Sequence, residues 1–249
     1  MRERVLGTPI DALDLEICVE RIAAWAAAAE SRTVCACNVH SVVTARRDPS
    51  FAAALEEADL CTADGAPIAW RLRRLGHRGQ PRVSGPDLMW RLCARAESDG
   101  LPIFLYGCRD ETLERLRSRF ARVFPRLRVA GSFAPPFRPL EPREDEAVVG
   151  RIARSGARIV FVALGCPKQE LWLAAHRGRI AAVLIGVGAA FDFHAGVVRR
   201  APPWMRRAGL EWLYRLAREP RRLWRRYLVT NALFAAYLAG QVLGERSRR

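Results

Sequence analysis

Arg158-Ile-Val-Phe-Val-Ala-Leu-Gly-Cys-Pro-Lys-Gln-Glu170 is the stretch that indicates the fold of this chain. Its apolar first half is typical of a strand buried on both faces of a parallel sheet. Gly165 is expected to end this strand, and Pro167 suits the first turn of a helix. The stretch therefore predicts a central strand that leads directly into a helix N-terminus, where open α/β sheets bind their ligands.

Lys168, inside this stretch, is the only lysine in a chain with 41 lysine and arginine residues. Arginine fills every other cationic position, so a lysine here suggests a place that needs a compact ammonium group. Lys168 and Gln169 are predicted to stand at the ligand-binding edge of the sheet. The alternative is a surface lysine that survived by chance.

Short apolar runs alternate with longer helical patterns along most of the chain. Strands are predicted at 33–38, 58–62, 102–107, 127–132, 158–165 and 180–187. Helices are predicted at 12–30, 48–57, 66–75, 86–99, 110–124, 143–155 and 167–177. This alternation predicts an α/β fold with a mostly parallel, Rossmann-like sheet flanked by helices. A proline-rich stretch at 134–139 is expected to be a loop, with a seam between two halves near 134–142.

The strand pattern does not return after residue 198. We therefore divide the chain into an α/β core, 1–198, and a basic, aromatic-rich helical appendage, 199–249. Pro220 is expected to break the appendage into two helices. The uncharged run 227–244 reaches the lower edge of a membrane span. Its polar residues and glycines favour an interfacial helix or one packed on the core, and the sequence leaves these two open.

Charge and cysteine content limit the classes of function. The formal charge of +15 indicates an anionic partner, with nucleic acid, anionic lipid and phosphorylated substrates as candidates. The seven cysteines form no C-x-x-C pair and no zinc-type spacing, so they are expected to be buried thiols of a reducing compartment. The N-terminus lacks the apolar run of a secretory signal, which favours a cytoplasmic location.

Several predicted strands end in glycine or Asp-Gly elements that would meet at one edge of the sheet. These elements are Asp64-Gly65, Gly107, Gly165 and Gly186-Val187-Gly188. Glycine lets a phosphate or a ring approach the backbone, and helix N-termini favour anions. Each glycine alone is also explained by a tight turn. None completes a G-x-G-x-x-G or Walker motif, so we predict no dinucleotide or ATP cofactor.

Asp64 is the predicted general base, because a carboxylate just past a strand is placed to accept a proton from a hydroxyl nucleophile. Capping of the following helix is the alternative role for this carboxylate. Asp192 is a second candidate, and His194 is either a base or a packed core histidine. The sequence contains no Asp-x-Asp, so we predict no metal site. Phosphate charge would then be met by arginine, Lys168 and backbone N–H groups.

Ordered blocks along nearly the whole chain give a more specific indication. They are Asn38, Asp48-Pro-Ser-Phe51, Ala58-Asp-Leu60, Asp64-Gly65, Arg82-Val-Ser-Gly-Pro-Asp87, Ile103-Phe-Leu-Tyr-Gly107, Gly131-Ser-Phe-Ala-Pro-Pro-Phe137, Gly165-Cys-Pro-Lys-Gln-Glu170, Gly186-Val-Gly-Ala-Ala-Phe-Asp192, Arg200-Ala-Pro-Pro-Trp204, Gly209-Leu-Glu-Trp-Leu213, Glu219-Pro220 and Arg225-Arg-Tyr227. Together these blocks resemble the WecG/TagA/CpsF family of bacterial glycosyltransferases. The resemblance implies inverting, metal-independent transfer of a hexose from a UDP-sugar to a saccharide on a polyprenyl diphosphate. It also implies a place at the anionic inner face of the cell membrane and a role in exopolysaccharide or cell-envelope glycan synthesis.

The resemblance also implies roles for single residues. Asp64 matches the proposed catalytic base, and Asn38 and Gln169 match polar active-site positions. Three C-terminal arginines match residues thought to reach the acceptor or the nucleotide diphosphate. The full substrate-binding set expected here is Asn38, Arg82, Gly107, Gly165, Lys168, Gln169, Gly186, Gly188, Asp192, Arg215, Arg222 and Arg225.

The sequence leaves the donor sugar, the class of function and the assembly state open. Ala36 stands where some family members carry threonine, and 131–137 looks closer to the family's glucosyltransferases. Glucose, N-acetylmannosamine and its uronic acid all remain candidates for the donor hexose. An arginine-rich nucleic-acid-binding protein and a nucleotide-dependent oxidoreductase are the rival functions. A homo-oligomer is also left open.

Overall fold

Parallel strands form the centre of the molecule. The computed structural model describes residues 1–246, except for the side chains of Arg222 and 242–246. Within the described chain the central sheet has six strands, namely β3 (Arg32–Cys37), β4 (Leu60–Ala63), β5 (Ile103–Gly107), β6 (Val129–Phe133), β7 (Ile159–Ala163) and β8 (Val183–Gly186). Every pairing between them is parallel. The α/β class and the predicted strands are confirmed, with ends that differ by up to three residues.

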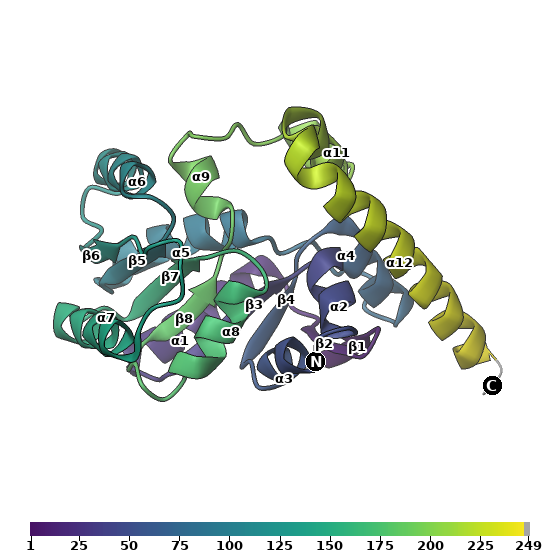
Figure 1. Cartoon of the computed structure of the whole chain (residues 1–249), viewed down its shortest axis with the longest axis horizontal. Helices are drawn as coiled ribbons and strands as arrows, with labels where there is room; N and C mark the ends of the chain where they lie inside the picture. The colour runs from purple at the N-terminus through teal and green to yellow at the C-terminus, as the bar shows by residue number, and fades with distance from the viewer. Residues whose placement is uncertain (247–249) are drawn as a thin grey trace.

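The strand order β4-β3-β8-β7-β5-β6 places β8 at the junction of two parts of the chain. On one side lie β3 and β4, and on the other lie β7, β5 and β6 (Figure 1). Because all the strands are parallel, their carboxyl ends meet at one edge of the sheet. Cys37 pairs with Ala63 in the register of β3 and β4, so the next residues, Asn38 and Asp64, are neighbours at that edge.

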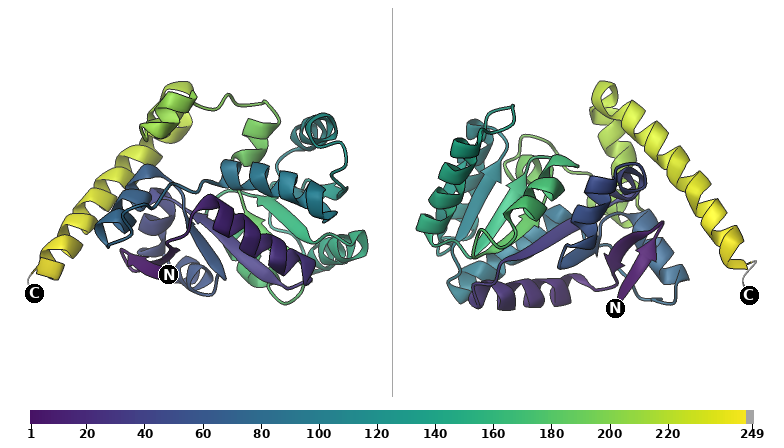
Figure 2. Two further views of the ribbon diagram at one scale, coloured as in Figure 1. Left: turned by 180° about the vertical axis from the view of Figure 1, so that it is seen from behind. Right: turned by 60° about the horizontal axis from the view of Figure 1, so that its bottom comes forward.

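Helices cover both faces of the sheet, because alternate side chains of the buried strands point to opposite sides. The helices of the core are α1 (Leu15–Ala27), α2 (Val39–Ala45), α3 (Pro49–Glu56), α4 (Ala66–Arg74), α5 (Gly85–Asp99), α6 (Asp110–Val123), α7 (Pro142–Ser155), α8 (Lys168–His176) and α9 (Ala190–His194). In β7, Phe161 belongs to the core cluster that includes residues of α1, α5 and α6, whereas Val162 belongs to the cluster that includes residues of α3, α7 and α8. Figure 2 shows α1 and α5 on the face turned away from the viewer of Figure 1.

Four elements of the core lie outside the predicted strand and helix ranges. The N-terminal strands β1 (Arg2–Val5) and β2 (Thr8–Asp11) form an antiparallel hairpin, with Leu6 in a left-handed conformation at its turn. This hairpin is tied to the core because the Asp11 carboxylate accepts hydrogen bonds from Arg2 and from the Cys61 backbone N–H. The short helices α2 and α9 also went unpredicted, because five to seven residues are too few to show a helical period.

Three helices make up the C-terminal part of the structure: α10 (Pro203–Arg207), α11 (Glu211–Arg218) and α12 (Pro220–Arg246). Pro220 begins α12, so the predicted break lies where expected. In Figure 1, α12 runs from α11 past α2 and ends away from the sheet. One face of α12 packs on the core through Phe234, whereas Leu228 on the helix is exposed. Among the described residues no helix has the length and apolarity needed to cross a membrane.

Candidate active site

Asn38 and Asp64 form the centre of the candidate site, at the carboxyl ends of β3 and β4. The Asn38 side-chain oxygen accepts hydrogen bonds from the backbone N–H groups of His40 and Ser41, which fixes this side chain as the cap of α2. The amide of Asn38 is thereby oriented to hydrogen-bond the Asp64 carboxyl. The N-cap of α4 is Gly65, so Asp64 is not the cap residue of that helix.

The environment of Asp64 suits a general base. Burial raises the pKa of its carboxyl to about 6, against the opposing effect of Arg82. Glu211 raises this pKa further, whereas the hydrogen bond from Asn38 and the charge of Arg200 lower it. A pKa in this range leaves most of the carboxylate ionised at neutral pH, and it still holds a proton better than an ordinary aspartate does.

An ion-pair network joins α11 to the core beside Asp64. Arg82 donates to Glu211 of α11 at 2.6 Å. Arg200 donates to both oxygens of Asp87, at 2.6 and 2.8 Å, and to Glu211 at 3.3 Å. Burial disfavours the charge on Asp87, but Arg200, Ser84 and Arg82 outweigh this effect and lower its pKa to about 2. The network therefore holds Glu211 and two guanidinium groups near the candidate base.

Lys168 and Gln169 occupy the start of α8, as predicted, but in different environments. Lys168 is exposed, whereas Gln169 is buried. The Gln169 side-chain oxygen accepts the Gly188 backbone N–H at 3.1 Å, and its amide donates to Glu170 at 3.0 Å. Gln169 therefore joins the start of α8 to the loop after β8. The candidate role of Lys168 in binding a ligand stays a prediction.

Glu170 is a buried carboxyl to which the sequence pattern gave no role. Its side chain is 2% exposed, and its Oε2 atom makes no hydrogen bond among the described residues. Burial raises the pKa of this carboxyl, against the effect of the Gln169 hydrogen bond. An acidic residue in the first turn of a helix is ordinary in a sequence, so nothing at that level marks its burial.

The glycines at the strand ends serve different purposes. A Cβ atom on Gly107 would lie 2.5 Å from the Ala163 backbone oxygen, so close packing against β7 accounts for this glycine. A Cβ atom on Gly186 would lie 3.1 Å from the Gln169 amide nitrogen. Gly165 and Gly188 have φ values of +79° and +54°, which favour glycine in these turns. Their part in ligand binding remains a prediction.

The residues predicted around α9 separate into two roles. His194 is buried, its Nε2 lies 2.9 Å from the Pro86 backbone oxygen, and its ring stacks on Trp90. Burial lowers the pKa of His194 to about 4, so His194 is a packed core histidine rather than a base. Asp192 lies over the loop after β5, with its Oδ1 atom 4.0 Å from the Cys108 sulfur.

The predicted C-terminal arginines are not equivalent. The Arg215 guanidinium lies over the Phe193 ring, 5.5 Å from its centroid, and its Nε atom is buried without a hydrogen-bond partner among the described residues. Arg225 is exposed on α12. The side chain of Arg222 lies outside the described residues. The structure therefore brings Arg215 against α9, beside the carboxyl edge of the sheet.

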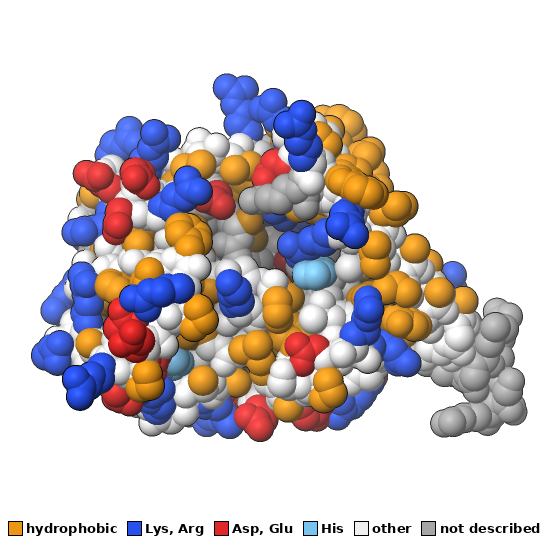
Figure 3. All heavy atoms as spheres, viewed as in Figure 1, with side chains coloured by type: hydrophobic (Ala, Val, Ile, Leu, Met, Phe, Trp, Pro, Cys, Tyr) orange, Lys and Arg blue, Asp and Glu red, His pale blue; other side chains and the backbone are white. Residues whose placement is uncertain are grey.

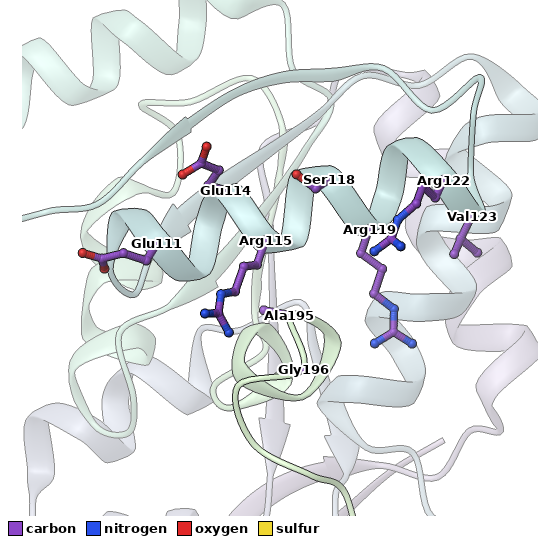
Figure 4. Close-up of a pocket in the computed structure, with 9 residues that line it drawn as sticks. All are labelled: Glu111, Glu114, Arg115, Ser118, Arg119, Arg122, Val123, Ala195 and Gly196. Carbon is purple, nitrogen blue, oxygen red and sulfur yellow. The ribbon is translucent and has the colours of Figure 1, made fainter.

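The surface of the molecule has hollows both at this site and away from it. Figure 3 shows a hollow between α9, α11 and α2, with cationic side chains around it. Another hollow, about 730 Å³, lies between α6 and Gly196, and none of the predicted site residues lines it (Figure 4). Among the described side chains, no three histidine, cysteine or acidic groups are grouped so as to hold a metal ion.

A parallel sheet with a buried carboxyl of raised pKa and nearby arginines at its carboxyl edge is typical of an α/β enzyme. The model of the family described as Glycosyl transferase WecG/TagA/CpsF matches residues 3–248, nearly the whole chain. The chain belongs to this family, as the ordered sequence blocks predicted. It is therefore a glycosyltransferase, which acts on a sugar donor and a saccharide acceptor.

Proposed function

We propose that the protein moves a hexose from a UDP-sugar to a saccharide linked to a lipid diphosphate, with inversion and without a metal. The observation that carries the proposal is the Asp64 carboxyl, hydrogen-bonded by Asn38 and with a pKa of about 6. The donor hexose is glucose, N-acetylmannosamine or its uronic acid, and the product belongs to exopolysaccharide or cell-envelope glycan. A nucleic-acid function has no support from the fold or the family.

The proposed reaction is a single displacement. An acceptor hydroxyl attacks the anomeric carbon while its proton moves to the Asp64 carboxylate. The bond between the anomeric carbon and the UDP oxygen breaks on the opposite face, so UDP leaves with the electron pair of that bond. Arg215, Lys168 and backbone N–H groups at the strand ends are proposed to meet the charge of the departing diphosphate.

The C-terminal helices support a peripheral place at the cytoplasmic face of the membrane. Their exposed apolar side chains are Trp204, Trp212, Leu213, Trp224, Leu228 and Val229. Apolar side chains follow α11 and α12 along one border of the molecule in Figure 3, next to cationic ones. Aromatic and arginine side chains together are typical of a surface that binds anionic lipid. This surface would hold the enzyme close to a lipid-linked acceptor.

The proposal is tested by incubating the protein with a panel of UDP-sugars and a prenyl-diphosphate glycan and measuring product mass. With the productive donor, Asp64→Asn is expected to lower kcat by about 10²–10⁴-fold, because the general base is lost. UDP affinity should remain close to that of the wild type. The matched control is Asp99→Asn, which alters an aspartate paired with Arg95 at the far end of α5. Transfer by Asp64→Asn at the normal rate would contradict the assignment.

A further inference from the structure

A second cationic hollow lies beside the candidate base, between α4, the start of α5 and α10. Its volume is about 490 Å³, and its lining includes Ala66, Arg73, Arg82, Asp87, Arg206 and Arg207. Ala66 begins α4 two residues after Asp64. Arg82 contributes to the pKa of Asp64, so this hollow and the base share one electrostatic environment.

The two acidic groups at this hollow pair with Arg82 and Arg200, so they leave the charge of its other arginines largely uncompensated. Both oxygens of Asp87 already accept hydrogen bonds from Arg200, and Glu211 already pairs with Arg82 and Arg200. Arg206 reaches Asp87 only at 3.6 Å, and its buried Nε atom has no hydrogen-bond partner among the described residues. The exposed Arg73 and Arg207 add two further guanidinium groups. Excess positive charge in a hollow of this kind favours a ligand with more than one negative charge.

The backbone at this hollow also favours a negatively charged ligand. The nine-residue helix α4 begins at this hollow, and its N-cap, Gly65, has no side chain to bond the first N–H groups of the helix. The positive end of the helix dipole and these N–H groups favour a phosphate. Gly209, which follows α10, approaches Ala66 so closely that a Cβ atom on it would lie 2.7 Å from the Ala66 Cβ. The helix start and the arginines of α10 are thus held together.

We propose that this hollow binds the diphosphate group of the lipid-linked acceptor. The inference rests on the proposed function and assigns one of its substrates to a place. A diphosphate here puts the sugar attached to it next to Asp64, where its hydroxyl is within the reach of the base. The apolar part of the acceptor would leave past exposed Trp70 of α4 and Trp204 of α10, two helices that line the hollow. The diphosphate of the nucleotide donor has the same chemistry, so the test must separate the two ligands.

Steady-state kinetics, with each substrate varied in turn, show whether the hollow binds the acceptor diphosphate or the donor diphosphate. The Arg206→Gln and Arg207→Gln double variant is expected to raise KM for the prenyl-diphosphate acceptor about tenfold or more, because charge-assisted hydrogen bonds are lost. KM for the UDP-sugar should change by less than about twofold. Arg73→Gln, on α4, tests the same hollow from another element. Arg95→Gln, which removes an exposed arginine from α5, is the matched control.

Two kinetic outcomes would overturn the proposal. A raised KM for the UDP-sugar with an unchanged KM for the acceptor would assign the hollow to the donor. Unchanged values for both substrates in the double variant and in Arg73→Gln would show that the hollow is not a substrate site. Thermal unfolding of each variant establishes whether it is folded before its kinetics are compared.

Direct binding separates this inference from the proposed reaction. Calorimetry is expected to show that farnesyl diphosphate and UDP can bind the wild type at the same time. The double variant should bind farnesyl diphosphate more weakly and UDP with unchanged affinity. Displacement of farnesyl diphosphate by UDP would overturn the inference. If no UDP-sugar supports transfer but the binding of farnesyl diphosphate still requires Arg206 and Arg207, the proposed reaction is wrong and the diphosphate site is retained.

Discussion

The centre of the site and the C-terminal helices are held in place by different kinds of interaction. Asn38 and Asp64 follow directly from the register of two buried strands, and backbone N–H groups fix the Asn38 side chain. No residue of α10 or α11 is fully buried, and Glu211 joins α11 to the core through its ion pairs with Arg82 and Arg200. Asp64, the proposed base, is therefore positioned by the fold of the sheet, whereas the positions of the arginines of α10 and α11 depend on how these helices dock.

The largest expected effect comes from removing the C-terminal helices α10, α11 and α12. A chain ending at residue 199 keeps the sheet and Asp64 but loses Glu211, Arg215 and the arginines of α10. We expect it to lose transfer to a lipid-linked acceptor and to be released from anionic liposomes, because both rely on the C-terminal helices. Activity assays and liposome flotation measure the two effects, with circular dichroism as the control for folding. Normal transfer together with normal flotation would show that the helices have neither role.

The pH dependence of kcat/KM tests the centre of the site, where Asp64 is positioned by the strands. Asp64 must be ionised to accept a proton, and its raised pKa is about 6. Below that pH, kcat/KM should fall about tenfold for each pH unit, and above it the value should level off. The residual activity of Asp64→Asn should lack this acidic limb. An acidic limb of the same position in Asp64→Asn would assign the titration to another group.

Asp87→Asn tests the ion pairs that attach the C-terminal helices. The variant should lower the free energy of unfolding by about 2 kcal/mol at pH 7, because the folded-state pKa of Asp87 lies well below its ordinary value. A lowered pKa stabilises the fold above the ordinary value of 3.8 and ceases to do so as the pH falls toward 2. Urea unfolding of wild type and variant should therefore converge over that interval. Asp99→Asn, an exposed pair, should change stability by less than about 1 kcal/mol.

Lys168→Arg is expected to have the smallest effect. Lys168 is exposed at the start of α8, where a guanidinium group would also reach an anion. We expect UDP affinity and transfer to change by less than about twofold, and Lys168→Gln to weaken UDP binding by up to about tenfold. Titration calorimetry with UDP compares the three proteins. A large loss in Lys168→Arg would show that the compact ammonium group is required.

The sheet was predictable from the sequence because β5 and β7 are continuous apolar runs. Asp64 was also predictable, since it follows a strand and precedes glycine. The network at Asp87 was not, because Arg82 and Glu211 are separated by 129 residues and meet only through the docking of α11. The role of His194 could not be predicted from its residue type, which suggested a base. Its burial against Trp90 shows that it is structural.

The central position of β8 also has a consequence for synthesis of the chain. Until β8 joins the sheet, the inner edges of β3 and β7 have no neighbour there, although about three quarters of the chain precedes this strand. Contacts between β3 and β8 span about 150 residues, a separation that slows folding. A nascent chain that stalls before residue 183 would expose two apolar strand edges, so this enzyme is expected to depend on chaperones during translation.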